Sequence, residues 1–421
     1  MHPYASIILQ KYYKATGWNE DNLYSNLTRS SAAILDFPVP RGVHFHISKS
    51  PNPLFKTTYS MNALPSLNGS VGYIFTSCDL NLRSSSDVRL KDVVERFKVY
   101  DLPRKPEGKS EEWLGGERVD TRDYLLYGRY YIPTSRLDAF YARPLKGNSG
   151  LGGANNVMIN LQHDTGRWST EYTWSADDGM LGARVLHNFG RLAGEEDVRE
   201  RVVGRGEKRV DEEDAMEGGL RGRFSAGAEV YFSAKEKSAG GSVDGFEIYD
   251  PSRCYSPSSQ LSSSPTIPTQ PPTTLTAIFN PMMGHLSTAY AARVSRDLSL
   301  CSRFDFNLYS YESEWTMGAE WWIRRAGRRS LNHTGNRASS AVAVSSPALP
   351  QIDAFDDASD ASTDGVQGVV KARMSTNTDV SLMWEGRIGK TLVSLGVVSD
   401  FSNRSKPIRA IGLELAYFSS E

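Results

Sequence analysis

The chain has 421 residues, a formal net charge of −1 and three cysteines, Cys78, Cys254 and Cys301. This balance offers no overall basic field for nucleic acid, and three scattered cysteines make neither a disulfide framework nor a zinc cluster. No stretch of about 18 apolar residues occurs, which excludes a transmembrane helix but not a membrane-spanning barrel, whose strands alternate lipid-facing and lumen-facing side chains.

Residues 1–17 are predicted to form an N-terminal helix. Tyr4, Ile8 and Tyr12 recur at helical spacing, and Gly17 provides a C-terminal stop. The segment has no arginine and no obvious cleavage motif, which argues against a targeting sequence. We therefore expect a short amphipathic helix that packs on the body of the protein.

From residue 42 onwards apolar residues alternate with polar ones, as they do in strands that have one apolar face. The clearest run is 220–234, in which Phe224 and Val230 share one face while Arg223 and Glu229 share the other. Turns of Gly, Asn, Asp and Ser separate these runs. We count about seventeen strand candidates and no second long helix.

Four long insertions interrupt the strands. They cover residues 79–121, 191–218, 236–273 and 327–364, and they are rich in charged residues or in Ser, Pro, Thr and Ala. Such compositions bury too little apolar surface to order themselves, so we expect polar loops. The remaining sequence gives each strand about 13 to 14 residues, which suits a membrane strand of ~9–11 residues and a short turn. The arithmetic predicts a single barrel domain, residues 1–421.

These features favour an all-β fold, a transmembrane up-and-down β-barrel, over two soluble competitors. Strands of a soluble sandwich average ~5–6 residues, whereas several runs here reach about 10 or more. Trp and Tyr often stand at strand ends, as at Trp168 and Trp174, where aromatic girdles of a membrane barrel lie. A large β-propeller would carry a repeated blade motif, and the sequence has none.

Motifs that carry chemistry were tested and rejected. Gly389-Lys390-Thr391 has the letters that end a phosphate-binding loop, but that motif needs glycine at position 384, which is Trp384. His44 and His46 share one strand face without an evident third metal ligand. No nucleophile–base–acid arrangement can be defended. The sequence therefore predicts no enzyme, no metal site and no cofactor.

The last predicted strand, 408–418, alternates apolar with small or mixed side chains. It resembles the sorting signal of mitochondrial outer-membrane barrels, in which a polar residue is followed two positions on by glycine and then by alternating hydrophobics. Gly412, Leu415 and Tyr417 fit that pattern, while the polar position falls on Ala410. The alternative is an ordinary last strand, of a barrel or of a soluble sandwich.

Further runs resemble one fungal family, mitochondrial distribution and morphology protein 10. They include residues 68–73, Asn-Gly-Ser-Val-Gly-Tyr, and the unusual run 127–139, Tyr-Gly-Arg-Tyr-Tyr-Ile-Pro-Thr-Ser-Arg-Leu-Asp-Ala. The resemblance implies a 19-stranded barrel in the mitochondrial outer membrane, similar in architecture to the voltage-dependent anion channel. The two strands missing from our count are expected at 33–37 and near 246–249 or 274–280.

The resemblance also implies a non-enzymatic function at ER–mitochondria contact sites. The family anchors the ER–mitochondria encounter structure (ERMES), whose other subunits are an ER membrane anchor, a soluble lipid-transfer protein and a second outer-membrane-associated protein. It also joins the sorting and assembly machinery (SAM) and helps mature the general import translocase. Expected partners are therefore these complexes and membrane lipids, and no nucleic acid. A solute channel is the alternative that a wide barrel alone would suggest.

Two aromatic residues are candidates for a docking surface on the outer wall. Tyr73 and Phe75 alternate on the predicted strand 71–75 and would point to the same side. Large outward aromatics suit contact with a neighbouring membrane protein. They equally suit an ordinary aromatic girdle at the membrane interface.

Overall fold

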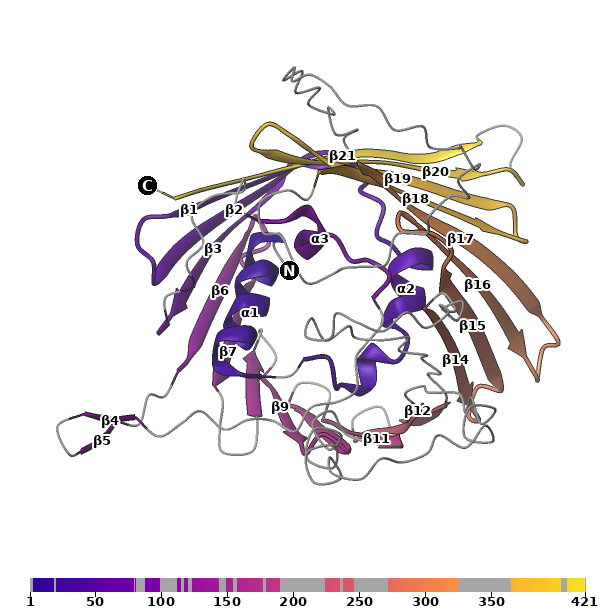
Figure 1. Ribbon diagram of the computed structural model, residues 1–421, viewed down its shortest axis with the longest axis horizontal. Coiled ribbons are helices and arrows are strands. Elements are labelled where there is room, and N and C mark those ends of the chain that lie inside the picture. Colours follow the sequence, from indigo (N-terminus) through magenta and orange to yellow (C-terminus); the bar gives the residue numbers. More distant parts are fainter. Residues whose placement is uncertain are drawn as a thin grey trace, which may run out of the picture.

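The computed structural model describes residues 3–18, 20–78, 80, 88–98, 112–114, 117–119, 123–143, 149–153, 157–176, 179–189, 224–234, 238–245, 272–324, 365–402 and 407–420. Within these ranges, 19 strands form one sheet that curves into a ring (Figure 1). A separate pair of short strands, β4 (Glu112–Leu114) and β5 (Glu117–Val119), lies apart from it. The expected all-β barrel architecture is confirmed.

The strands of the first half are β1 (Gly42–Ser50), β2 (Phe55–Leu64), β3 (Asn68–Thr76), β6 (Leu125–Ile132), β7 (Leu137–Arg143), β8 (Ser149–Gly153), β9 (Val157–Asp164), β10 (Trp168–Ser175) and β11 (Met180–Phe189). The strands of the second half are β12 (Phe224–Ser233), β13 (Ser238–Gly245), β14 (Thr273–Asn280), β15 (His285–Arg293), β16 (Leu298–Asn307), β17 (Ser313–Arg324), β18 (Val366–Ser375), β19 (Asp379–Ile388), β20 (Thr391–Asp400) and β21 (Ile408–Ser420). Each strand pairs with its neighbours in chain order, which is up-and-down topology.

The ring closes between its first and last strands. β1 pairs with β21 in parallel, from Gly42 opposite Gly412 to Ser50 opposite Ser420, whereas every other pair in the sheet is antiparallel. An odd number of alternating strands leaves the first and last pointing the same way, so closure requires one parallel pair. On the inner face of this seam, His46 Nε2 lies 3.3 Å from a carboxylate oxygen of Glu414. Closure leaves the 19-stranded sheet without a free edge strand.

One expected strand position and one expected loop need correction. Residues 33–37 belong instead to the end of helix α2 (Arg29–Leu35) and the turn after it, and Ile34 and Leu35 pack against Ala291 and Cys301 of the wall. The position 246–249 lies outside the described residues. The position 274–280 is confirmed as β14. The remaining strand, β13, lies inside the segment 236–273 that was expected to be a polar loop. Its sequence, Ser-Ala-Gly-Gly-Ser-Val-Asp-Gly, lacks the apolar alternation that marks most of the other strands.

The other expected insertions lie mostly outside the described residues. Nothing described falls within 191–218 or 327–364. Within 79–121, a short helix α3 (Leu90–Val93) and the β4–β5 hairpin are present. The segment 88–98 that contains α3 runs inside the ring, where Val94 and Phe97 are buried.

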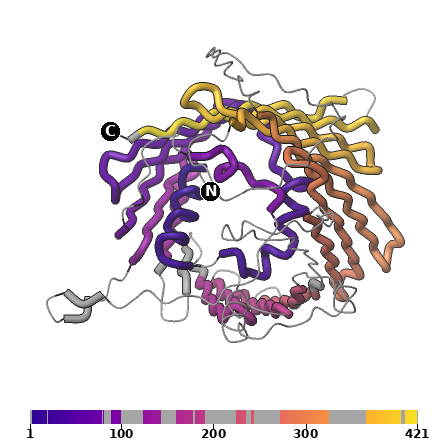
Figure 2. The backbone as a smooth tube through the Cα atoms, viewed as in Figure 1, coloured from indigo at the N-terminus to yellow at the C-terminus, as the bar shows by residue number. Residues whose placement is uncertain are grey.

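The N-terminal segment lies inside the barrel. Helix α1 (Pro3–Thr16), the short 3₁₀ helix η1 (Tyr24–Asn26) and α2 follow the inner wall in turn (Figure 1), and the tube trace shows the same course (Figure 2). The helix expected at 1–17 is thus present, and the body on which it packs is the inner wall. No helix among the described residues is long and apolar enough to span a membrane.

The wall sorts its side chains by face. On β2, Lys56, Thr58 and Ser60 point inward and are buried, while Tyr59 and Met61 point outward, each 45% exposed. The period of two explains the sorting, because neighbouring strand residues face opposite sides of the sheet. This strand is therefore polar on its inner face and apolar on its outer face.

Candidate functional surfaces

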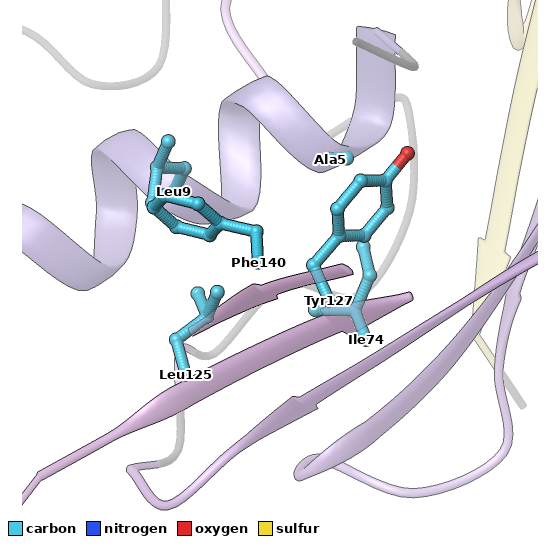
Figure 3. Close-up of a pocket in the computed structure, with 6 residues that line it drawn as sticks. All are labelled: Ala5, Leu9, Ile74, Leu125, Tyr127 and Phe140. Atoms are coloured by element: carbon cyan, nitrogen blue, oxygen red, sulfur yellow. The ribbon is translucent and has the colours of Figure 1, made fainter. Parts of the chain in front are cut away.

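Helix α1 provides the apolar contact between the N-terminal segment and the wall. Tyr4, Ile8 and Tyr12 are almost fully buried, and they belong to one cluster with Ile74 of β3 and Leu125 of β6. The close-up of this contact shows side chains of α1 and the wall facing one another across a small pocket (Figure 3). Its cavity volume of about 10 Å³ is at the lower limit for a single water molecule. The contact is a packed interface rather than a ligand site.

Tyr12 adds a polar anchor to this contact. Its hydroxyl donates to the backbone carbonyls of Asp123 at 3.1 Å and Ala142 at 3.3 Å. Burial raises the pKa of the Tyr12 phenol, with smaller contributions from nearby groups that include Cys78 and Asp123. The phenol therefore remains a protonated donor at neutral pH.

Two basic side chains of strand β18 bind the C-terminal end of α2. Lys371 Nζ donates to the Ala33 carbonyl at 2.9 Å and to the Glu95 carbonyl. Arg373 donates to the Leu35 carbonyl at 2.9 Å. The last carbonyls of a helix have no partner within the helix and carry the negative end of its dipole, so cations are favoured there. Lys371 is 1% exposed, so its charged group is buried against these carbonyls.

A salt bridge and a carboxylate complete the attachment on the same side. Arg303 of β16 lies 2.7 Å from the carboxylate of Asp36, directly after α2. Glu320 of β17 accepts a hydrogen bond from the Phe97 backbone N–H at 3.1 Å and one from the Trp322 indole at 2.6 Å. Strands β16 to β18 therefore bind both the N-terminal segment and the segment 88–98.

A third attachment lies on the arc of β11 to β13. Asn188 Nδ2 donates to Asn22 Oδ1 at 2.7 Å, and the hydroxyls of Tyr24 and Ser242 are 3.0 Å apart. The lumen therefore holds a plug, defined here as residues 3–18 and 20–41 together with 88–98, that is attached to the wall on three arcs. Sequence reasoning missed the residues that hold it. The sequence does show charged residues on the strand face opposite the apolar stripe, but this pattern does not indicate which residues they contact.

The predicted docking residues Tyr73 and Phe75 both lie on the outer face of β3. Tyr73 is 52% exposed and stacks on Phe55 with ring centroids 5.9 Å apart. Phe75 is half-buried and stacks on Tyr124 at 5.8 Å. The two residues thus share a face, and each ring is part of an aromatic pair along the wall.

The predicted sorting residues are divided between the two faces of β21. Gly412 faces inward, and a Cβ atom added there would lie 2.1 Å from the Pro40 carbonyl oxygen. Leu415 and Tyr417 face outward, opposite Phe45 and Ile47 of β1. The glycine therefore has a structural reason, the close approach of the chain that leads from α2 into β1. That reason is independent of any signal.

The two histidines considered as metal ligands are occupied by hydrogen bonds of the wall. His44 Nδ1 lies 2.7 Å from Asn62 Oδ1, and its Nε2 lies 2.7 Å from the Arg41 carbonyl oxygen. His46 Nδ1 lies 2.9 Å from the Ser60 hydroxyl. Among the described residues, no three His, Cys, Asp or Glu side chains converge as metal ligands would.

Together these features define a class of protein: a large closed β-barrel with an apolar outer belt and a lumen occupied by its own plug. The sequence matches the profile of one family, mitochondrial distribution and morphology protein 10, over residues 1–351 and 339–420. It is 60% identical over the whole of both chains to the protein of that name from Postia placenta, and equally to that from Laccaria bicolor. The Cryptococcus neoformans relative is 40% identical over 99% of each chain. The chain belongs to this family.

Proposed function

We propose that this protein is a non-enzymatic barrel of the mitochondrial outer membrane that acts in mitochondrial distribution and morphology. The observation that carries the proposal is the outward apolar belt, which includes Tyr59, Tyr172, Trp321 and Leu382, each at least 45% exposed. Soluble monomers rarely leave apolar surface of such extent in contact with water. In a bilayer this outer belt contacts acyl chains instead of water, which removes the cost. A closed barrel also satisfies its backbone hydrogen-bonding groups internally, as a membrane requires.

Family membership supports a more specific proposal. The barrel serves as the outer-membrane anchor of ERMES at ER–mitochondria contact sites, where its partners are the ER membrane anchor, the soluble lipid-transfer subunit and the second outer-membrane-associated subunit. It also joins SAM and acts in assembly of outer-membrane barrels and of the import translocase. A chain whose lumen is filled by its own plug suits anchoring, because the outer wall and rims are the surfaces left for partners.

The test combines fractionation with affinity purification. In mitochondria treated with alkaline carbonate, the protein should remain in the membrane pellet, and a tagged copy should recover subunits of both complexes after mild solubilisation. Extraction into the supernatant would overturn the membrane assignment. Recovery of neither complex from an embedded protein would overturn the anchor and assembly roles alone.

The docking role of Tyr73 and Phe75 is part of this proposal. Alanine at both positions should reduce recovery of one complex by removing two outward aromatic rings, while barrel abundance stays unchanged. The matched control is alanine at Tyr290, an outward residue of β15 that is 53% exposed. Full recovery of both complexes by the double variant would assign the pair to the aromatic girdle instead.

The sorting role of Leu415 and Tyr417 is likewise proposed. A last strand recognised by strand addition would offer backbone hydrogen bonds for affinity and outward side chains for specificity. Tyr417→Ser should delay assembly of imported protein, whereas Tyr290→Ser, at an equally outward position in another strand, should not. Equal assembly rates for both variants would contradict the signal.

A further inference from the structure

One arc of the outer wall carries imidazoles among apolar neighbours. His163 on β9 and His187 on β11 both point outward, because His163 lies opposite Thr170 and His187 opposite Trp168 in the sheet register. Trp168 is the first residue of β10 and directly follows the exposed Arg167. These four residues, His163, Arg167, Trp168 and His187, form what we call the β9–β11 basic cluster, at one end of the strands.

The surroundings of His187 indicate a partner outside the chain. Its ring packs edge-on against Trp168, with ring centroids 4.2 Å apart, and lies 4.4 Å from the ring of Phe189. Its Nδ1 is buried without a hydrogen-bond partner. Phenylalanine would fill this aromatic site without leaving a buried nitrogen unpaired. The other ring nitrogen, Nε2, is therefore the atom through which this imidazole can donate to a ligand.

The charge of this arc is one-sided. Arg167, His163 and Trp168 are exposed, and His163 and Trp168 lie on the outer face. The carboxylates of the same strands point into the lumen, where Asp164 accepts a hydrogen bond from Asn22 Nδ2 at 2.7 Å and Glu171 lies 3.5 Å from Arg184. Among the described residues of β9 to β11, the outer face therefore presents N–H donors and no carboxylate.

We propose that the β9–β11 basic cluster binds the phosphate of an anionic phospholipid whose acyl chains lie along the apolar belt. The inference rests on the proposed membrane location. Imidazole and guanidinium N–H groups suit a phosphate oxyanion, and Trp168 stands where an indole would mark the headgroup level. Basic groups at the membrane edge are attracted to anionic lipid. Tyr172 and Val185, farther along the same face, supply the contact for the acyl chains.

The test is native mass spectrometry of the full-length protein purified in detergent. Phosphatidic acid and phosphatidylcholine are offered in equal amounts, and inorganic phosphate is offered in a separate arm. Wild type should retain roughly tenfold more phosphatidic acid than phosphatidylcholine, since the cluster supplies several basic groups. Inorganic phosphate should not compete, because it lacks the acyl contacts. Competition by inorganic phosphate at the same concentration would overturn the assignment to a lipid.

Variants separate the site from the fold. The triple variant His163→Gln, Arg167→Gln, His187→Phe should lose the preference for phosphatidic acid. His187→Phe alone should weaken that preference while keeping the aromatic packing and a thermal midpoint no lower than that of wild type. The matched control is Trp174→Ala, an outward tryptophan at the opposite end of β10. Unchanged lipid preference in the triple variant, or equal loss in the control, would overturn the site.

This outcome is distinguishable from failure of the proposed function. Wild-type protein that remains in the carbonate pellet but binds the two lipids equally would overturn the lipid site and leave the membrane location standing. Wild-type protein that carbonate extracts would overturn both.

Discussion

At the scale of single residues, two features link the plug to the wall: a glycine that lets two backbone segments approach closely, and basic side chains that point into the lumen. Gly412 allows the chain after α2 to cross the seam, because Pro40 lies where a side chain would be. Lys371, Arg373 and Arg303 place their charges on the end of α2 or on the carboxylate beside it. None of these contacts involves neighbours in the sequence. Single substitutions at such positions therefore report on tertiary structure.

Gly412→Ala is expected to destabilise the barrel. Its Cβ would lie 2.1 Å from the Pro40 carbonyl oxygen, so backbone must shift. The control is Gly128→Ala, at a strand glycine where an added Cβ meets nothing within 4 Å. Thermal unfolding in detergent should show a lower midpoint for Gly412→Ala than for wild type. Gly128→Ala should not lower the midpoint, since Ala in an open strand position is favoured over Gly by roughly 0.5–1 kcal/mol. Equal midpoints would contradict the close approach. An assembly defect of Gly412→Ala does not by itself identify a signal.

At the scale of elements, the apolar pattern of the sequence predicts α1 but does not predict β13. Helix α1 has a clear apolar periodicity, and the structure uses that face against the wall. Strand β13 has almost no apolar pattern and is held by its neighbours, pairing with β12 from Ser233 opposite Ser238 to Ala226 opposite Gly245. Backbone pairing on both sides can hold a glycine-rich strand that its own side chains do not specify.

Alkaline pH is expected to release α1 before the barrel unfolds. Burial raises the pKa of Tyr4 and of Tyr13 from 10.0 to about 12, and it raises that of Tyr12 as well. Because the folded state holds these protons more tightly, the stabilisation is complete below pH 10 and is lost as the pH rises through about 12. Tyrosinate absorbance followed alongside circular dichroism should show the tyrosines titrating before strand signal is lost. In Tyr4→Phe/Tyr12→Phe the release should move to higher pH. Coincident loss of both signals in wild type would contradict independent release.

The boundary of β13 changes what can be deleted. Replacing residues 246–271 by a short Gly-Ser linker should leave a folded, membrane-embedded barrel, since long loops cost little additional closure entropy. Replacing 236–273 should prevent closure, because it removes the partner that lies between β12 and β14. Carbonate extraction and heat-resistant migration in mild detergent compare the two variants. Normal insertion of the longer replacement would show that the sheet closes without β13.

For the whole molecule, the decisive arrangement is a plug inside a closed wall. The plug meets the wall through an apolar contact at α1 and through charged hydrogen bonds at α2 and at Phe97. A barrel with this many strands encloses a wide lumen when it is empty. How freely solutes pass through the lumen is therefore expected to depend on how firmly the plug is held.

Weakening the plug is expected to raise conductance. The triple variant Lys371→Met, Arg373→Gln, Arg303→Gln removes hydrogen bonds from charged donors, each worth about 1.5–3 kcal/mol. In planar bilayers it should conduct more than wild type, and protease should cleave its N-terminal segment faster. Lys390→Met and Arg409→Gln, at exposed positions, serve as controls for the loss of positive charge away from the plug. Unchanged conductance together with unchanged cleavage would contradict the role of these three residues.

The sequence by itself determined the period of two, the large single barrel, the N-terminal helix and the family, because alternation and specific runs such as 127–139 are local properties of the chain. It also placed Tyr73, Phe75, Leu415 and Tyr417 on an outward face, since that follows from parity along a strand. Only the tertiary structure decided that the helix lies inside, that 33–35 is the end of a second helix, and that 238–245 is a strand. These facts depend on contacts between residues far apart in the chain, such as Lys371 with Ala33, and on pairing supplied by neighbouring strands. A one-dimensional pattern does not contain such contacts.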